Sequence, residues 1–92
     1  MPRARTTKPV TPEAAIFGER LHELRTKRGL TIEALADDIE VSRTYVSNLE
    51  VGAKVPSLTT LLRLAAALDC NVTDLVKVFN GRDLRTLVKK RR

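Results

Sequence analysis

The sequence predicts an all-α protein of five short helices joined by short connections. Apolar residues recur every three or four positions in five successive segments, which is the spacing of one face of a helix. Each segment follows a residue that can cap a helix and precedes a glycine or a polar break. The chain shows no alternating strand pattern, no hairpin dipeptide and no internal repeat.

The first helix is expected from Thr11 to about Arg28. Thr11 can cap it, and Pro12 suits the first helical position because the N–H that proline lacks would be unpaired there anyway. Gly29 then provides a stop. The apolar stripe of this helix consists of Phe17, Leu21 and Leu24.

The second and third helices are also short. Thr31 is the cap of a helix of barely two turns, and Ser42 is the cap of the next, which Gly52 ends. The inward set of the two helices is Leu35, Ala36, Ile39, Val41, Val46 and Leu49. Ala36 falls where the helices cross, and a small side chain there permits a close crossing. Two short helices joined by about three residues predict a helix-turn-helix unit.

The fourth helix follows the "AKVPS" loop, with Ser57 as its cap. Its apolar residues are Leu58, Leu61, Leu62, Ala65 and Leu68. A fifth helix is expected to begin at Asn71 or Thr73 and to close at the Asn80–Gly81 pair. Its apolar residues are Val72, Leu75, Val76 and Phe79.

We expect one folded domain over residues 11–81, flanked by two basic ends. Residues 1–10 contain two prolines and no apolar period, which indicates a disordered arm. Residues 82–92 are either a short sixth helix or a basic tail. The 92 residues suffice for one core and are too few for a second.

Positive charge is concentrated at the two ends. Residues 1–12 carry three basic residues and no acid, and residues 82–92 carry six basic residues and one acid. Residues 13–81 hold ten acids against eight basic residues. Basic ends on a folded body favour a polyanionic partner, most often nucleic acid. A solubility tail or a membrane-surface patch is the alternative.

Several other classes of protein are not expected. The single cysteine, Cys70, excludes an internal disulfide and a cysteine-based zinc cluster, and it favours a reducing compartment. No apolar run has the length of a signal peptide or a membrane span, so we expect the cytoplasm, with nucleoid association when DNA is bound. The single histidine, His22, has no nucleophile or orienting acid at a recognisable spacing. We therefore expect no enzyme, no metal and no cofactor.

Two stretches of the sequence resemble the phage repressor and Cro-like, or XRE-like, helix-turn-helix domains. They are "LRTKRGLTIEALADDIEVSRTYVSNLEVG" and "PSLTTLLRLAAALD", within residues 24–69. The resemblance implies a compact repressor-like domain that binds double-stranded DNA as a homodimer, reads a palindromic operator through the major groove and represses rather than activates transcription. The alternative is an antitoxin of this fold, which would bind a toxin protein and its own promoter.

The resemblance makes the stretch "VSRTYVSNLEVG", residues 41–52, the recognition helix. The side chains that it places at base edges are Arg43, Thr44, Ser47 and Asn48. Arg43 suits the two acceptors of guanine and Asn48 suits adenine. The expected DNA backbone contacts are Ser42, Lys54, Tyr45 and the arm residues Arg3 and Arg5, the last two at a phosphate or in the minor groove. Packing on the domain is the stronger interpretation of Tyr45, and a solvated side chain is the alternative for Lys54.

The resemblance also assigns structural roles. Arg25 and Glu50 stand where similar repressors form a buried ion pair. Ile32 stands where the family commonly has a phosphate-contacting Gln, which puts that contact in doubt. Glu40 stands at a turn position usually filled by Gly, and a positive φ there bears a cost of order 1 kcal/mol.

Acidic residues cluster on the second predicted helix. They are Glu33, Asp37, Asp38 and Glu40. We interpret them as a solvated face. The sharper hypothesis is that Glu33 and Asp37 touch RNA polymerase, as acids at these positions do in some similar repressors.

A pairing surface is expected at the end of the chain, because one recognition helix touches too few base pairs to select a site. Its expected residues are Leu75, Val76, Phe79, Leu84, Leu87 and Val88. The alternative is that the tail folds back onto its own core.

Overall fold

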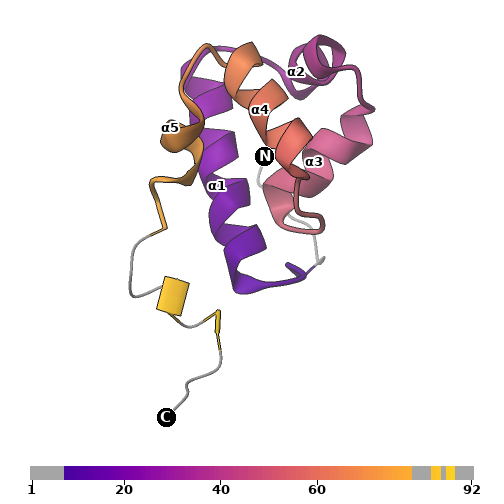
Figure 1. Ribbon diagram of the computed structural model, residues 1–92. Helices are drawn as coiled ribbons and strands as arrows, with labels where there is room; N and C mark the ends of the chain where they lie inside the picture. The colour runs from indigo at the N-terminus through magenta and orange to yellow at the C-terminus, as the bar shows by residue number, and fades with distance from the viewer. Residues whose placement is uncertain (1–7, 80–83, 86, 89–92) are drawn as a thin grey trace.

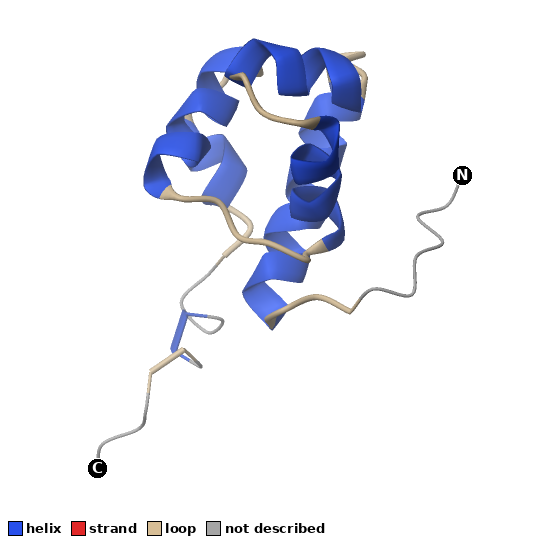
Figure 2. Ribbon diagram, turned by 90° about the vertical axis from the view of Figure 1, so that its right-hand side faces the viewer, coloured by secondary structure: helices blue, strands red, loops and turns tan. Residues whose placement is uncertain are grey.

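The computed structural model describes residues 8–79, 84–85 and 87–88, and it contains five α-helices (Figure 1). They are α1 (Pro12–Lys27), α2 (Ile32–Ile39), α3 (Arg43–Val51), α4 (Leu58–Ala67) and α5 (Val72–Val76). Figure 2 shows helices joined by short loops and no strand in the described parts of the chain. The predicted all-α class with five helices is confirmed. Of the two predicted basic ends, residues 1–7, 82–83, 86 and 89–92 lie outside the described residues.

The predicted caps begin the first four helices. Thr11 Oγ1 accepts a hydrogen bond from the Ala14 N–H at 3.1 Å, and Ser42 Oγ accepts one from the Tyr45 N–H at 3.0 Å. In the same way, the Thr31 hydroxyl accepts a hydrogen bond from the Ala34 N–H, and the Ser57 hydroxyl accepts one from the Thr60 N–H. Each hydroxyl satisfies one of the N–H groups that a helix start leaves without a partner.

The fifth helix is shorter than predicted. It begins after Asn71, whose N–H donates to the Asp74 carboxylate at 3.0 Å, and not at Thr73. The helix ends at Val76, and Phe79 lies beyond it in a turn. The Phe79 N–H donates a hydrogen bond to the Val76 carbonyl at 3.0 Å, which closes this turn. The predicted stop at Asn80 and Gly81 lies outside the described residues.

Two left-handed residues end α2 and α3. Glu40 has φ 62° and ψ 48°, and Gly52 has φ 83°. Glycine takes this conformation without strain, whereas a residue with a Cβ does not. Glu40 therefore holds the turn between the two helices at a cost in conformational energy.

The core lies where the five helices meet. Its buried residues are Phe17, Leu21, Leu35, Ala36, Ile39, Val46, Leu49, Leu64, Ala65, Leu68 and Leu75. In Figure 1, α3 and α5 lie on opposite sides of α1, and both pack against it. Leu64 belongs to the core, whereas Leu58 and Leu62, which the sequence grouped with the apolar residues of α4, are 70% and 50% exposed.

Candidate nucleic-acid interface

The polar side of α3 faces outward and its apolar side is buried. Val46 and Leu49 have no exposed surface. Arg43 and Thr44 are exposed, and Ser47 and Asn48 are half-buried. These four polar side chains line one shallow hollow together with Arg25, Thr31, Ile32 and Glu33. The four side chains expected at base edges therefore share one surface with the start of α2.

The loop after α3 is fastened to the helix that precedes it. The Asn48 carbonyl accepts hydrogen bonds from the N–H groups of Ala53 at 2.8 Å and Lys54 at 3.3 Å. The Lys54 side chain is exposed beside the end of α3. Tyr45 is half-buried and packs against the core, as its stronger sequence interpretation has it. Ser42 is exposed, and its side chain caps α3.

α1 and α3 touch backbone to backbone at Gly18. A Cβ at this position would lie 2.4 Å from the Glu50 carbonyl oxygen and 2.5 Å from that of Leu49. No side chain fits in this space. Gly18 therefore allows the last turn of α3 to lie directly on α1. This contact was not predictable from the sequence, because a glycine inside a helix normally only weakens that helix.

A buried ion pair lies beside this contact. The Arg25 guanidinium donates through Nε to Glu50 Oε2 and through Nη2 to Oε1, the latter at 3.1 Å. Its Nη1 donates to the Leu30 carbonyl at 2.7 Å. The two side chains are 10% and 3% exposed. Bidentate pairing with a further bond satisfies most of the polar atoms that burial removes from water.

His22 joins the pair, which the sequence analysis missed. Its Nδ1 lies 3.0 Å from Glu50 Oε1 and 3.2 Å from Arg25 Nη2. His22 stands three residues before Arg25, so the two side chains lie on the same face of α1. That spacing was the signal available in the sequence. The ring is 40% exposed, and its role here is to complete the polar cluster that fixes α3 on α1.

The chain enters the domain at the end of α3. The Val10 N–H donates to the Gly52 carbonyl at 2.8 Å, and a Cβ on Gly52 would lie 3.0 Å from Pro9 Cβ. The last residues of the arm expected at 1–10 are thus held against the end of α3. Arg3 and Arg5, the expected backbone contacts, lie outside the described residues.

The acidic residues of α2 all reach solvent. Glu33, Asp37, Asp38 and Glu40 are exposed, and Glu33 also borders the hollow beside α3. Ile32 lines the same hollow and packs partly against the core. An isoleucine offers no hydrogen bond to a phosphate, so the start of α2 brings no donor from that side chain to the candidate interface.

The expected pairing residues differ in how far they are exposed. Leu75 is fully buried in the core of its own chain, so the expectation that it pairs with a second copy is wrong, because it has no surface to offer. Val76 and Phe79 are half-buried against the same core. The other three residues, Leu84, Leu87 and Val88, are 51%, 55% and 70% exposed.

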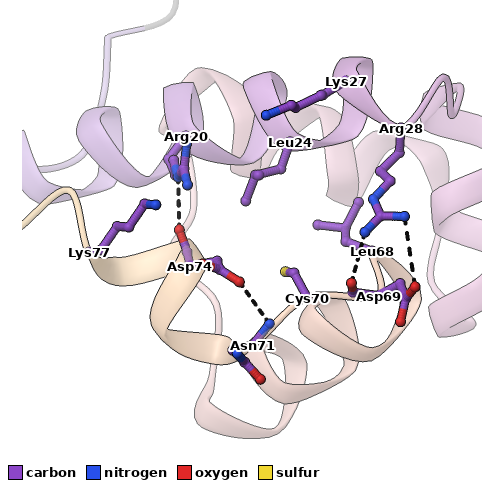
Figure 3. A pocket seen from close by; sticks show the side chains of 10 residues that line it. All are labelled: Arg20, Leu24, Lys27, Arg28, Leu68, Asp69, Cys70, Asn71, Asp74 and Lys77. Atoms are coloured by element: carbon purple, nitrogen blue, oxygen red, sulfur yellow. Dashed lines mark hydrogen bonds and ion pairs between the residues drawn. The ribbon is translucent and has the colours of Figure 1, made fainter.

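A second hollow, lined by side chains of both charges, lies between α1 and the turn from α4 to α5 (Figure 3). Arg20 Nε donates to the Asp74 carbonyl, and Arg28 Nη2 donates to the Asp69 carbonyl, both at 2.8 Å. Burial, and then the nearby Asp74 carboxylate, raise the pKa of the Cys70 thiol, which stays protonated and poorly reactive. The described residues include no group of His, Cys, Asp and Glu side chains that could hold a metal ion.

These features define a class of protein. Two short helices, α2 and α3, pack against each other, α3 is fixed on α1 by the contact at Gly18 and a buried ion pair, and its polar side faces outward. That is a helix-turn-helix unit in a repressor-like domain. None of the helices in the described ranges has both the length and the apolar character needed to cross a bilayer.

The comparison with protein families agrees. A family model described as "Helix-turn-helix" matches residues 21–75, which is more than half of the chain. The chain belongs to this helix-turn-helix family, and the resemblance to XRE-like regulators seen in the sequence is confirmed.

Curated relatives are transcription regulators by name. The chain is 44% identical over 59 residues to the HTH-type transcriptional regulator DdrOP3 of Deinococcus deserti, with 64% of this chain and 46% of the relative covered. It is 37% identical over 59 residues to the immunity repressor of Bacillus phage phi105, with 64% and 41% covered. The first three curated relatives are covered over 46%, 34% and 57% of their own lengths, so the chain spans roughly half of them.

Solved structures show the same fold. The restriction-modification controller protein C.AhdI from Aeromonas hydrophila has a TM-score of 0.69 and 42% identity, with 71% of this chain and 98% of that chain covered. The biofilm regulator SinR, solved in complex with DNA, has a TM-score of 0.62 and 30% identity, with 65% and 97% covered.

Proposed function

We propose that this chain binds double-stranded DNA sequence-specifically, as a homodimer on a palindromic operator, and represses transcription. The observation that supports the proposal most strongly is the orientation of the amphipathic helix α3. Its apolar side is buried and its four polar side chains share one surface hollow. A helix presented in this way fits the major groove, where each base pair offers a distinct pattern of donors and acceptors.

Each polar side chain of α3 has a role in this proposal. Arg43 is exposed in the first turn and reaches the two acceptors of guanine. Asn48 is half-buried one turn further along and suits the adenine edge. Thr44 and Ser47 lie between them and contact bases of either kind. Ser42 and Lys54, at the two ends of the helix, contact phosphates on either side of the groove.

Two copies are needed because one helix reads only a few base pairs. A symmetric pair places the two recognition helices one helical turn of DNA apart, about 34 Å, so that the operator repeats in inverted order. The names of several relatives support regulation of transcription, and one of them is an immunity repressor. SinR, whose fold is similar, is solved bound to DNA, which supports DNA as the ligand here.

Selection of bound duplexes from a random pool tests the proposal. The wild-type chain is expected to enrich an inverted repeat. Arg43→Ala is expected to relax the preference at one base pair of each half-site, with a loss of discrimination of about 1–3 kcal/mol there. Because Arg43 is exposed, the stability of the variant should stay within about 0.5 kcal/mol of the wild type.

Lys54→Ala is the matched control for this experiment. An exposed lysine that meets a phosphate contributes equally to all sequences, so its loss should weaken all binding alike and reduce the salt dependence by about one released counterion per copy, about two for the dimer. If Arg43→Ala behaves in the same way as Lys54→Ala, Arg43 holds the backbone and does not read a base. If no inverted repeat is enriched by the wild type, the proposal of a dimer on a palindrome is wrong.

A further inference from the structure

Seven large apolar side chains of the described residues are half or more exposed, and six of them form two groups. The first group lies on α4 and the loop before it and consists of Val55, Leu58 and Leu62. The second consists of Leu84, Leu87 and Val88. Exposed apolar groups of this kind mark surfaces that are covered in an assembly.

The first group belongs to an apolar outer face of α4. Leu58, Leu62 and Ala66 are spaced four residues apart, so they form one stripe along the helix, and all three are exposed. α4 contains no acidic residue. Its one basic residue, Arg63, donates through Nη1 to the Ile39 carbonyl at 3.3 Å. Across its stripe, α4 therefore presents apolar surface without a charge of its own.

At Ala66 this face meets an acidic hollow. The hollow is lined by Asp38, Ile39, Glu40, Arg63, Ala66 and Ala67. Asp38 and Glu40 are exposed, and neither forms an ion pair with a basic side chain in the described part of the chain. The α4 surface, as we call the stripe and this hollow together, thus combines apolar side chains with two carboxylates and the guanidinium of Arg63, and the carboxylates outnumber the cation.

The second group has the complementary chemistry. The Leu87 N–H donates to the Leu84 carbonyl at 3.1 Å, which forms a turn that carries the group. Residues 82–92, in which it stands, hold six basic residues and one acid. The second group can therefore pack its apolar side chains on the apolar stripe of α4, while the basic residues around it lie near the carboxylates of Asp38 and Glu40.

The two groups of one chain do not cover each other. Leu84, Leu87 and Val88 keep 51%, 55% and 70% of their surface exposed, although the α4 surface of the same chain is open. In Figure 1 the two short yellow segments near the C-terminus, 84–85 and 87–88, lie away from the helical body. The α4 surface therefore remains open to a group from another molecule.

We propose that the α4 surface of one copy receives Leu84, Leu87 and Val88 of a second copy, and that the exchange is reciprocal. This proposal rests on the homodimer proposed above and names its surface. A stable interface buries about 1,200–2,000 Å² in total, which three side chains from each copy do not reach. Reciprocal exchange buries both groups of both copies, and a two-fold axis generates the second contact from the first.

Disulfide trapping between two different chains tests the exchange. In a Cys70→Ser background, one chain carries Leu58→Cys or Leu62→Cys, and a second, longer-tagged chain carries Leu84→Cys, Leu87→Cys or Val88→Cys. After mixing and mild oxidation, at least one pairing is expected to give a disulfide between a long and a short chain, because a disulfide needs Cα atoms within about 7 Å. Trapping only between two α4 cysteines indicates helix-to-helix pairing and overturns the proposal, as does the absence of any trapped pair.

A chain that carries both cysteines distinguishes exchange from folding back. Leu62→Cys combined with Leu87→Cys is expected to form a disulfide-linked dimer. A disulfide closed within one monomer at low protein concentration, together with no mixed dimer, shows that the group folds onto its own α4 and overturns the proposal.

Sedimentation equilibrium gives a measurement that needs no oxidation. Leu58→Ser with Leu62→Ser, and separately Leu84→Ser with Leu87→Ser, are each expected to raise the dimer Kd about tenfold or more. The matched control is Val10→Ser, which removes the seventh exposed apolar side chain and should leave the Kd unchanged. An unchanged Kd in either double variant overturns the exchange. Binding to a single half-site by the same variants reports on base reading, so failure of this surface and failure of the DNA-binding proposal are distinguished.

Discussion

Two regions of the molecule differ in their packing: α1 and α3 are in tight contact, whereas the outer face of α4 is exposed. At the first, two backbones touch at Gly18, and the Arg25–Glu50 pair is buried beside them. At the second, Leu58 and Leu62 are 70% and 50% exposed. The difference shows that this small domain packs α3 tightly against α1 and leaves apolar surface exposed on α4.

The physical requirement differs between the two regions. A base-reading side chain must be held within a fraction of an ångström of its partner, so the helix that carries it needs a rigid base. The backbone contact at Gly18 and the hydrogen bonds of Arg25 supply that base. A surface that pairs with a second copy must instead stay uncovered in the single chain. Substitutions in the first region should therefore cost stability, and substitutions in the second should not.

The largest effect is expected from Arg25→Ala. Removal of the guanidinium takes away the cation that pairs with the Glu50 carboxylate, whose side chain is 3% exposed. Breaking a buried pair in this way costs about 3–5 kcal/mol of the free energy of unfolding. Urea denaturation measures it. The control is Arg63→Ala, which removes an exposed arginine with one hydrogen bond and should cost about 1 kcal/mol. Equal losses from the two variants would contradict a rigid base at α1 and α3.

Gly18→Ala should come next. Alanine normally stabilises a helix interior relative to glycine by about 0.5–1 kcal/mol, but here the new Cβ would meet the Glu50 carbonyl at 2.4 Å. Overpacking against backbone is expected to reverse the sign and to cost about 1–3 kcal/mol.

The matched glycine for this test is Gly29. A Cβ there meets nothing within 4 Å, and its only cost, at φ 73°, is the left-handed conformation, about 1 kcal/mol. Gly18→Ala is expected to melt at or below the temperature of Gly29→Ala, and a melting temperature for Gly18→Ala at or above that of the wild type would show that α1 and α3 are not in close contact.

Glu40→Gly should have a smaller effect, and in the opposite direction. Release of the left-handed strain at φ 62° should stabilise the domain by about 1 kcal/mol, which corresponds to a rise of roughly 4–8 °C in melting temperature. The control is Asp38→Gly, two residues earlier inside α2, which should destabilise by about 1 kcal/mol. A lower melting temperature for Glu40→Gly would mean that its side chain contributes more than the turn costs.

The smallest effect is expected on the outer face of α4. Leu62→Ala, at a protein concentration where the chain is monomeric, should change stability by about 0.5 kcal/mol or less. Leu64→Ala, two positions away but with no exposed surface, should cost about 2–5 kcal/mol. Thermal unfolding of the two variants measures the contrast. Similar losses of stability in the two variants would contradict the contrast between the exposed face of α4 and its buried side.

The sequence was most informative about where helices begin and which way α3 faces. The structure has the predicted N-caps because a hydroxyl just before a helix accepts a hydrogen bond from a backbone N–H of the first turn. The caps are Thr11, Thr31, Ser42 and Ser57. The outward side of α3 was predictable because its polar and apolar residues alternate with helical spacing. The expectation for Arg25 and Glu50 came from family resemblance, since nothing in the spacing of two residues 25 positions apart indicates contact.

Other features depended on packing that no local pattern encodes. α4 has apolar residues almost all round, so its periodicity could not distinguish the buried Leu64 from the exposed Leu62. Leu75 looked available for pairing because the sequence does not show how much of α5 the core covers. Gly18 was missed because close approach of two backbones leaves no trace except the absence of a side chain.

The central claim is that the polar side of α3 enters the major groove, and chemical protection of DNA tests it most directly. Guanine N7 lies in the major groove and adenine N3 in the minor groove, and dimethyl sulfate methylates both. On a selected operator, we expect the wild-type chain to protect a guanine N7 in each half-site and Arg43→Ala to restore its methylation while the DNA stays bound. Protection of adenine N3 alone, with every guanine N7 still reactive under the bound protein, would contradict the claim.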